Sequence, residues 1–189
     1  MGAPSQRVRA LQQRRLLLSG VLAGWDSTQA VGADGTIELT QRALLPRPVV
    51  AVSPDGAAQL GSAYWRAVRA VTHGLVRCRE HARGVELRLF GVTLLAFQEA
   101  ETHVTDDEVG CTFAITGGFL ARLPGGALTL AQERAGPAIR STITGYTPRF
   151  AARAGGPGWT GALYTHVQQR VHAAVSRRYF RQLIAEAAG

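Results

Sequence analysis

The chain has no lysine and no asparagine, and its 189 residues include a single methionine. All 21 basic residues are therefore arginine. Arginine, alanine, glycine and proline have GC-rich codons and lysine and asparagine do not, so codon composition accounts for much of this choice. The net charge of +8 and the sequence pI near 10.9 are then weak evidence for a polyanionic partner. Because the arginines are spread along the chain, without a basic face carrying interleaved aromatic residues, we do not expect nucleic-acid binding.

Cysteine is also scarce, with Cys78 and Cys111 far apart in the sequence. Metal clusters and disulfide frameworks need closer or more numerous partners, so this pattern favours two buried thiols in a reducing compartment. A single disulfide between neighbouring strands is the alternative. His166 and His172 lack the i, i+4 spacing of a helical metal pair. No P-loop, dinucleotide fingerprint or nucleophile elbow is present. We therefore expect no metal and no cofactor, and a cytoplasmic protein.

No apolar run approaches the roughly 20 residues that cross a bilayer, so we expect no membrane span. The N-terminus leaves two interpretations open. Arg14 and Arg15 precede the short apolar run 16–24, which suits a twin-arginine export signal. The alternative is an N-terminal helix with Val8, Leu11 and Leu18 at helical spacing. We assign residues 1–35 to an N-terminal helical extension and residues 36–189 to one domain, since 46% hydrophobic residues suffice for one substantial core.

The period of the apolar residues changes twice along the chain. A helix is expected from a Ser53 cap and Pro54 to about Val71, with Gly61 as a candidate break. Period-two alternation then predicts strands, which we place at 36–40, 75–80, 85–90, 92–104, 109–115, 127–134 and 139–146, with residues 49–52 as a further edge strand. In the hairpin that joins the last two main strands, Glu133 and Arg140 are expected to face each other. Short turns between successive strands favour an antiparallel meander.

The last thirty residues predict one long helix, because neither Pro nor Gly occurs between Ala162 and Ala188. An apolar row recurs every four residues from Leu163 to Leu183 and is expected to face the sheet. Phe180 and Ile184 lie off that row, so we expect them to pack on the N-terminal helix or on the second subunit of a homodimer.

The element order resembles the helix-grip fold of the START and Bet v 1-like superfamily, which includes bacterial polyketide cyclases. The residues that carry the resemblance are 113–118 (Phe-Ala-Ile-Thr-Gly-Gly), 148–149 (Pro-Arg), 167–170 (Val-Gln-Gln-Arg) and 177–180 (Arg-Arg-Tyr-Phe). The resemblance covers about residues 36–187. It implies an α+β fold in which a curved antiparallel sheet wraps around the long C-terminal helix. It also implies a cavity between them for a lipid- or polyketide-like hydrophobic molecule.

Several aromatic and polar side chains are candidates for contacts with such a molecule: Tyr64, Trp65, Phe97, Arg140, Tyr146, Trp159 and Tyr164. Arg140 and Tyr146 occupy one face of their strand together with Thr142 and Thr144, so they are expected to act together. A non-catalytic binding protein is the function that we favour.

An enzyme, a cyclase or dehydratase, is the alternative. It rests on Glu99, Glu101 and His103, which alternate on one face of the predicted strand 92–104 and offer a carboxylate–imidazole pair for acid–base catalysis. That face also carries Leu95 and Phe97, whereas the opposite face carries Leu94 and Ala96. Either face can point inward, and if the second does, the charged groups are solvated.

Overall fold

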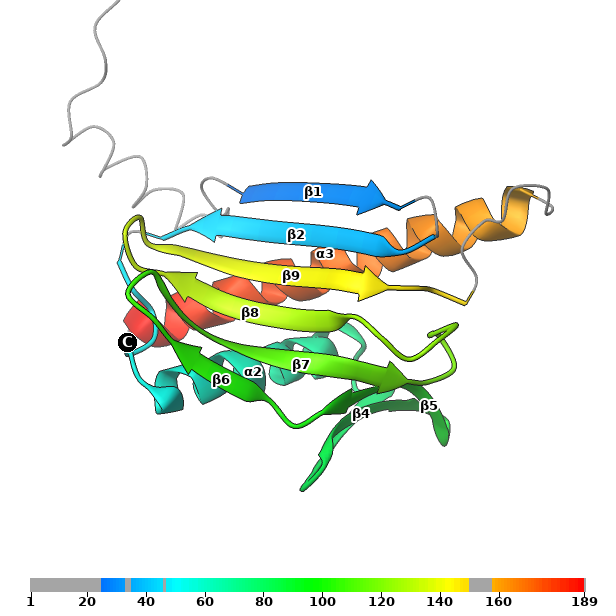
Figure 1. Cartoon of the computed structure of the whole chain (residues 1–189), viewed down its shortest axis with the longest axis horizontal. Coiled ribbons are helices and arrows are strands. Elements are labelled where there is room, and N and C mark those ends of the chain that lie inside the picture. Colours follow the sequence, from blue (N-terminus) through cyan, green and yellow to red (C-terminus); the bar gives the residue numbers. More distant parts are fainter. Residues whose placement is uncertain (1–24, 33–34, 46, 150–157, 189) are drawn as a thin grey trace, which may run out of the picture.

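The structure, a computed structural model, describes residues 25–32, 35–45, 47–149 and 158–188, with side chains of the last segment described from 170 to 187. The described residues form an α+β fold, in which a nine-stranded antiparallel sheet carries two helices on one face (Figure 1). The helices are α2 (Pro54–Val71) and α3 (Gly158–Ala188). The strands are β1 (Trp25–Val31), β2 (Ile37–Leu44), β3 (Val76–His81), β4 (Gly84–Leu89), β5 (Val92–Gln98), β6 (Glu101–Val104), β7 (Glu108–Gly117), β8 (Ala127–Glu133) and β9 (Ala138–Tyr146).

Strands β3, β4, β5, β7, β8 and β9 pair antiparallel in chain order, which confirms the predicted meander for these strands. The full order is β1-β2-β9-β8-β7-β5-β4-β3, with β6 also paired to β7. The β1–β2 hairpin joins the sheet beside β9, a long-range pairing that the sequence analysis did not predict. It also did not predict β1, because six of the seven residues of this strand are exposed and leave no apolar alternation to detect.

The predicted strand 92–104 is two strands, and this difference changes which face its residues occupy. β5 pairs with one end of β7 through Phe97 and Ile115, whereas β6 pairs with the other end. Residues 99 and 100 between them belong to neither strand. Figure 1 shows β4 and β5 curling away from the plane of the other strands at this break. The break allows the sheet to close over the helices at one end.

Helix α2 begins and ends where the sequence predicts. The Ser53 hydroxyl accepts a hydrogen bond from the Gly56 N–H at 3.1 Å, and Pro54 occupies the first turn, where no N–H is needed. The predicted break at Gly61 is wrong, since α2 is continuous. A Cβ at Gly61 would lie 2.9 Å from Cζ of Phe113. Glycine is therefore required for close packing of α2 on β7.

The predicted edge strand at residues 49–52 is also wrong, because this segment is a loop. Gln132, which is 1% exposed, holds the loop from β8. Its side-chain oxygen accepts the N–H groups of Val49 at 2.6 Å and Val50 at 2.9 Å, and its amide donates to the Val50 carbonyl at 3.0 Å. A glutamine side chain thus takes the place of a neighbouring strand.

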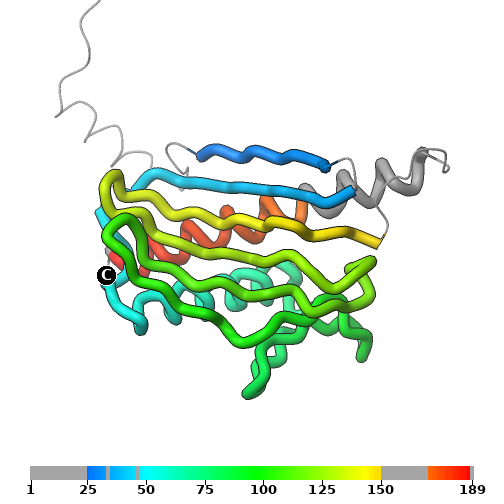
Figure 2. Tube along the Cα trace, in the orientation of Figure 1, coloured from blue at the N-terminus to red at the C-terminus, as the bar shows by residue number. Residues whose placement is uncertain are grey.

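Helix α3 packs beside α2 and is joined to the sheet by a buried polar contact in which Ser176 donates to Gln41 on β2. Tyr179 meets Tyr64 of α2 edge to face, with 5.5 Å between the ring centroids. Phe180 is fully buried and contacts Trp25 of β1, with 5.4 Å between the ring centroids, so a second subunit is not needed to cover it; the N-terminal helix expected as its partner lies outside the described residues. Figure 2 shows the end of α3 close to the segment that leads into α2, and Arg47 of that segment donates to the Ala187 carbonyl. Arg66 of α2 itself pairs with Glu186 at 2.9 Å.

None of the helices in the described part of the chain is both long enough and apolar enough to cross a bilayer.

The contacts of Gln132 lead to a prediction for stability. A Gln132→Met substitution keeps the side-chain volume but removes the partner of the Val49 N–H and of the Val50 N–H and carbonyl. The Val49 N–H is partly exposed and can bind water, whereas the two buried groups of Val50 cost roughly 1–3 kcal/mol each, so the free energy of unfolding should fall by about 2–6 kcal/mol. Urea unfolding measures this change. Gln98→Met, at an exposed position on β5, is the matched control, and equal losses in both variants would contradict the assigned role.

Candidate ligand-binding cavity

A cavity of about 220 Å³ lies between the two helices and the curled part of the sheet. Its walls come from α2, α3, strands β3, β4, β5, β7, β8 and β9, and the loop after β7. The lining residues are Tyr64, Trp65, Val68, Thr72, Val76, Leu87, Leu94, Leu95, Phe97, Ile115, Leu120, Leu128, Ile143, Tyr146, Val171, His172 and Val175. None of these described lining residues is Asp, Glu, Lys or Arg. The cavity is therefore a largely apolar site.

Aromatic packing fixes one wall of the cavity. The Trp65 ring on α2 lies 5.2 Å from the Phe97 ring on β5 and 5.0 Å from the Phe113 ring on β7, centroid to centroid. Tyr64 packs edge to face on Trp65 at 5.2 Å. Of the aromatic residues that the sequence singles out, Tyr64, Trp65, Phe97 and Tyr146 all line the cavity.

Tyr146 reaches the cavity because a β-bulge reverses its face of β9. Ile37 and Leu39 are two residues apart on β2, whereas their partners on β9, Tyr146 and Ile143, are three residues apart. Gly145 in this bulge has φ of 63°, in the left-handed region that glycine adopts without strain. One extra residue exchanges the two faces of a strand. The expectation that Tyr146 and Arg140 share a face is therefore wrong.

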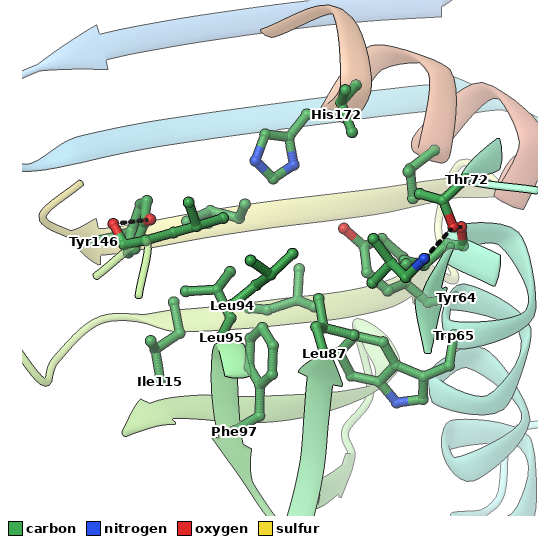
Figure 3. A pocket seen from close by; sticks show the side chains of 17 residues that line it. Tyr64, Trp65, Thr72, Leu87, Leu94, Leu95, Phe97, Ile115, Tyr146 and His172 are labelled. Carbon is green, nitrogen blue, oxygen red and sulfur yellow. Dashed lines mark hydrogen bonds between the residues drawn. The ribbon is translucent and has the colours of Figure 1, made fainter. Parts of the chain in front are cut away.

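Two of the polar groups at the cavity already have partners within the protein. The Tyr146 hydroxyl donates to the Leu120 carbonyl at 2.9 Å. The Thr72 hydroxyl donates to the Val68 carbonyl at 2.8 Å, one turn earlier in α2. Figure 3 draws the Tyr146 bond as a dashed line, and a second dashed line joins the Thr72 hydroxyl to the Val76 N–H, which donates to it at 3.4 Å. These two hydroxyls therefore stabilise the protein backbone and are not free to bind a ligand.

Tyr64 and His172 are different, because they direct polar atoms into the cavity. Figure 3 shows the Tyr64 hydroxyl and the His172 ring projecting from the two helices into the same space, with no hydrogen bond to any other residue drawn. Burial raises the pKa of the Tyr64 hydroxyl well above its usual range. Burial also lowers the pKa of His172 to about 4. Near neutral pH the cavity thus offers a phenol donor and an uncharged imidazole.

His172 was not among the candidate residues from the sequence, where it was considered only as a metal ligand. The signal that points to it is its spacing from Val175, Tyr179 and Leu183, all of which are buried. The apolar row predicted from Leu163 to Leu183 has a period of four and places Val171, not His172, on the buried face of α3. Val171 is in fact 43% exposed. A helix has 3.6 residues per turn, so a four-residue row drifts off the buried stripe and His172 takes its place.

The residues of the proposed acid–base group lie away from the cavity. Glu99 and Glu101 are exposed, and neither they nor His103 line the cavity. In β5, Leu95 and Phe97 line the cavity together with Leu94, which the register shift between β4 and β5 leaves without a paired residue. The break at residues 99–100 then reverses the alternation. In β6, His103 pairs with Gly110 on the outer face of the sheet, and its Nε2 lies 3.1 Å from a carboxylate oxygen of Glu108.

Arg140 also lies on the outer face, where it pairs with Glu108 at 2.5 Å. It was expected to face Glu133 across the hairpin, but in the observed register Glu133 lies opposite Ala138. Glu133 instead binds Arg42 of β2, with the closest nitrogen–oxygen distance at 2.6 Å. The hydrogen bond from Arg42 lowers the pKa of Glu133. These ion pairs form a charged row on the face opposite the helices.

Trp159 and Tyr164, the remaining candidates for ligand contact, lie outside the residues whose side chains the structure describes.

The two cysteines are free thiols that pack on α2. Cys78 Sγ lies 3.6 Å from the Trp65 carbonyl, and Cys111 lies beside Gly61. Burial raises the pKa of Cys78 to about 11 and that of Cys111 to about 12. Both thiols are therefore protonated and unreactive in the folded protein.

Comparison with known proteins finds no match to this chain among family models, curated proteins or solved structures.

The burial of His172 leads to a prediction for stability against pH. The imidazole has a pKa near 6.5 in the unfolded chain and about 4 in the folded protein, so between these values the unfolded chain binds the extra proton. Stability should be intact above pH 6.5 and fall by up to ~3 kcal/mol as the pH drops towards 4. His172→Leu removes this loss, so urea unfolding at several pH values should give a flatter profile for the variant. Parallel profiles would show that His172 is solvated.

Proposed function

We propose that this protein binds a compact, largely apolar small molecule in the cavity between the helices and the curled end of the sheet. The observation that carries the proposal is an apolar cavity into which only two uncommitted polar groups project among the described lining residues, Tyr64 and His172. Ligand sites commonly combine an apolar lining with a few placed polar groups.

The size of the cavity limits the ligand. Pockets for drug-sized molecules usually measure about 300–1,000 Å³, and an apolar cavity of about 150 Å³ holds benzene. At about 220 Å³, this site suits a molecule of one or two rings, or a short alkyl chain, better than a whole phospholipid. A small polyketide-like compound fits this range.

The polar groups favour an uncharged ligand with one hydroxyl or carbonyl group. Tyr64 can donate a hydrogen bond, and neutral His172 can donate or accept one. A carboxylate would need a cation beside it, because an unpaired charge in an apolar site is strongly unfavourable. His172 supplies such a cation only if its pKa rises by several units from about 4.

The arrangement of helices and sheet supports a helix-grip architecture, as the resemblance to the START and Bet v 1-like superfamily implies. In this structure the sheet covers both α2 and α3, and α2 packs against β7. The free thiols suit a reducing compartment such as the cytoplasm. The alternative cyclase or dehydratase function draws no support from the geometry, since Glu101 and His103 lie on the outer face and Glu99 is exposed outside the cavity.

Filling the cavity tests the proposal. Leu95→Trp should lower the affinity for a compact aromatic probe, 1-naphthol, by roughly a hundredfold, because the larger ring occupies the space that the probe needs. Fluorescence titration measures the affinity. Leu44→Trp adds the same ring at an exposed position outside the cavity and should bind the probe like the wild type. If Leu95→Trp and the wild type bind 1-naphthol equally, or if neither binds it, the cavity is not a site for this class of ligand.

The role of the two polar groups has its own test with three probes that share one ring system. The wild type should bind 1-naphthol about tenfold more tightly than naphthalene, because the hydroxyl gains hydrogen bonds. It should bind 1-naphthoate most weakly. Tyr64→Phe and His172→Leu should each reduce the preference for 1-naphthol and leave naphthalene binding nearly unchanged. A preference that survives both substitutions would place the polar contact elsewhere.

A further inference from the structure

Four large apolar side chains are exposed along one edge of the curled strands: Leu75, Phe90, Val92 and Phe119. We call them the apolar edge. The strand register gathers them, since Val76 lies opposite Leu89 and Leu89 lies opposite Val92. The Phe119 N–H donates to the carbonyl of Thr93, the residue after Val92, at 2.9 Å. Segments far apart in the sequence thus present apolar side chains together.

Phe90 is the most unusual member of the apolar edge, because it combines full exposure with backbone strain. It lies in the tight turn between β4 and β5 with φ of 47°, followed by Gly91 with φ of 89°. Turns with two left-handed residues strongly prefer Asn, Asp or Gly, and a bulky aromatic residue is rare there. The Phe90 side chain is 87% exposed, so packing does not offset the strain. A strained residue with no role in packing indicates a function.

Arginines predominate among the charges around the apolar edge, where the carboxylate of Glu86 pairs at 4.0 Å with Arg88, the residue opposite Arg77. Arg77, Arg122 and Arg149 are exposed near it, and none of the three forms an ion pair with a described residue. The Arg149 guanidinium stacks over the Phe119 ring at 5.6 Å. The segments 70–79, 87–98 and 109–132 contain no Asp or Glu. An apolar edge with arginines beside it complements the surface of an anionic membrane, where charged headgroups lie above an apolar layer.

The edge also borders the cavity. Leu75 precedes the lining residue Val76, and Phe119 precedes the lining residue Leu120. The Leu120 N–H donates to the carbonyl of Leu94, another lining residue, at 3.0 Å. A surface docked on this edge would therefore meet the protein beside its cavity.

We propose that the apolar edge docks on an anionic lipid bilayer. In this arrangement Phe90 inserts between the lipid headgroups, and the arginines bind lipid phosphates. The size of the edge favours a bilayer over a protein partner. A stable protein interface buries about 800 Å² on each side, whereas four side chains of this size present a few hundred Å² at most. Partial insertion of one aromatic residue, supported by several arginines, is sufficient for peripheral membrane binding. This docking needs no bound ligand, so it does not rest on the proposed function.

Flotation with vesicles tests the docking in the full chain. The wild type should bind vesicles that mix phosphatidylcholine and phosphatidylglycerol, and should bind phosphatidylcholine vesicles about tenfold more weakly. Phe90→Asn should lower binding to the mixed vesicles by about tenfold or more, since it removes the inserted ring. The same substitution should keep or raise the melting temperature, because Asn tolerates left-handed backbone. Lost binding with unchanged or higher stability cannot be ascribed to misfolding.

Two variants serve as controls. Val31→Asn changes an exposed apolar residue on β1, outside the apolar edge, and should bind vesicles like the wild type. Phe90→Trp keeps an aromatic ring at the tip and should retain binding. The N-terminal arginines are present in every variant, so they do not affect the comparison. The proposal is overturned if the wild type does not bind mixed vesicles, if Phe90→Asn binds them equally well, or if Phe90→Asn only converts a dimer into a monomer in light scattering.

Discussion

The structure depends on the burial of Trp65 between strands β5 and β7. Trp65 is 2% exposed and contacts the rings of Phe97 and Phe113, each from a different strand. These contacts hold α2 against the sheet at the place where β5 leaves the plane of the other strands. Helix α3 then packs beside α2 through Tyr179 and Tyr64. Because the curled strands follow α2 while α3 lies across the flatter part of the sheet, the cavity forms where these three parts meet.

The two faces of the sheet differ in chemistry, since one is apolar and the other carries charged and polar side chains. The inner face supplies the apolar walls of the cavity and contacts both helices. The outer face carries paired charges, including Arg42 with Glu133 and Arg140 with Glu108, and pairs of threonine hydroxyls, such as Thr112 with Thr129 at 3.1 Å. Surface ion pairs of this kind contribute little to stability, typically less than ~1 kcal/mol each. Changes on the outer face are therefore expected to leave the cavity intact, which makes it possible to study one face without the other.

Much of the fold follows from local sequence patterns. The cap at Ser53 determines where α2 begins, and the alternation of Val109, Cys111 and Phe113 identifies β7 and its buried face. Local patterns fail where one residue changes the geometry. The bulge at Gly145 turns Tyr146 towards the cavity, and the break at residues 99–100 turns Glu101 and His103 away from it. Part of the lining of the candidate cavity was predicted, namely Tyr64, Trp65, Phe97 and Tyr146. His172 was missed because the exact rotation of α3 depends on its contacts with α2 and β2, which the helix sequence alone does not determine.

The positions of the two cysteines have a consequence for the dynamics of the protein. Cys78 and Cys111 contact α2 at Trp65 and Gly61, one helical turn apart, and burial keeps both thiols protonated. Cys111 is fully buried, whereas Cys78 is half-buried. An opening that lifts α2 from the sheet exposes Cys111 to solvent and restores its ordinary reactivity. The labelling of Cys111 by a thiol reagent, compared with that of Cys78, therefore reports how often α2 separates from the sheet.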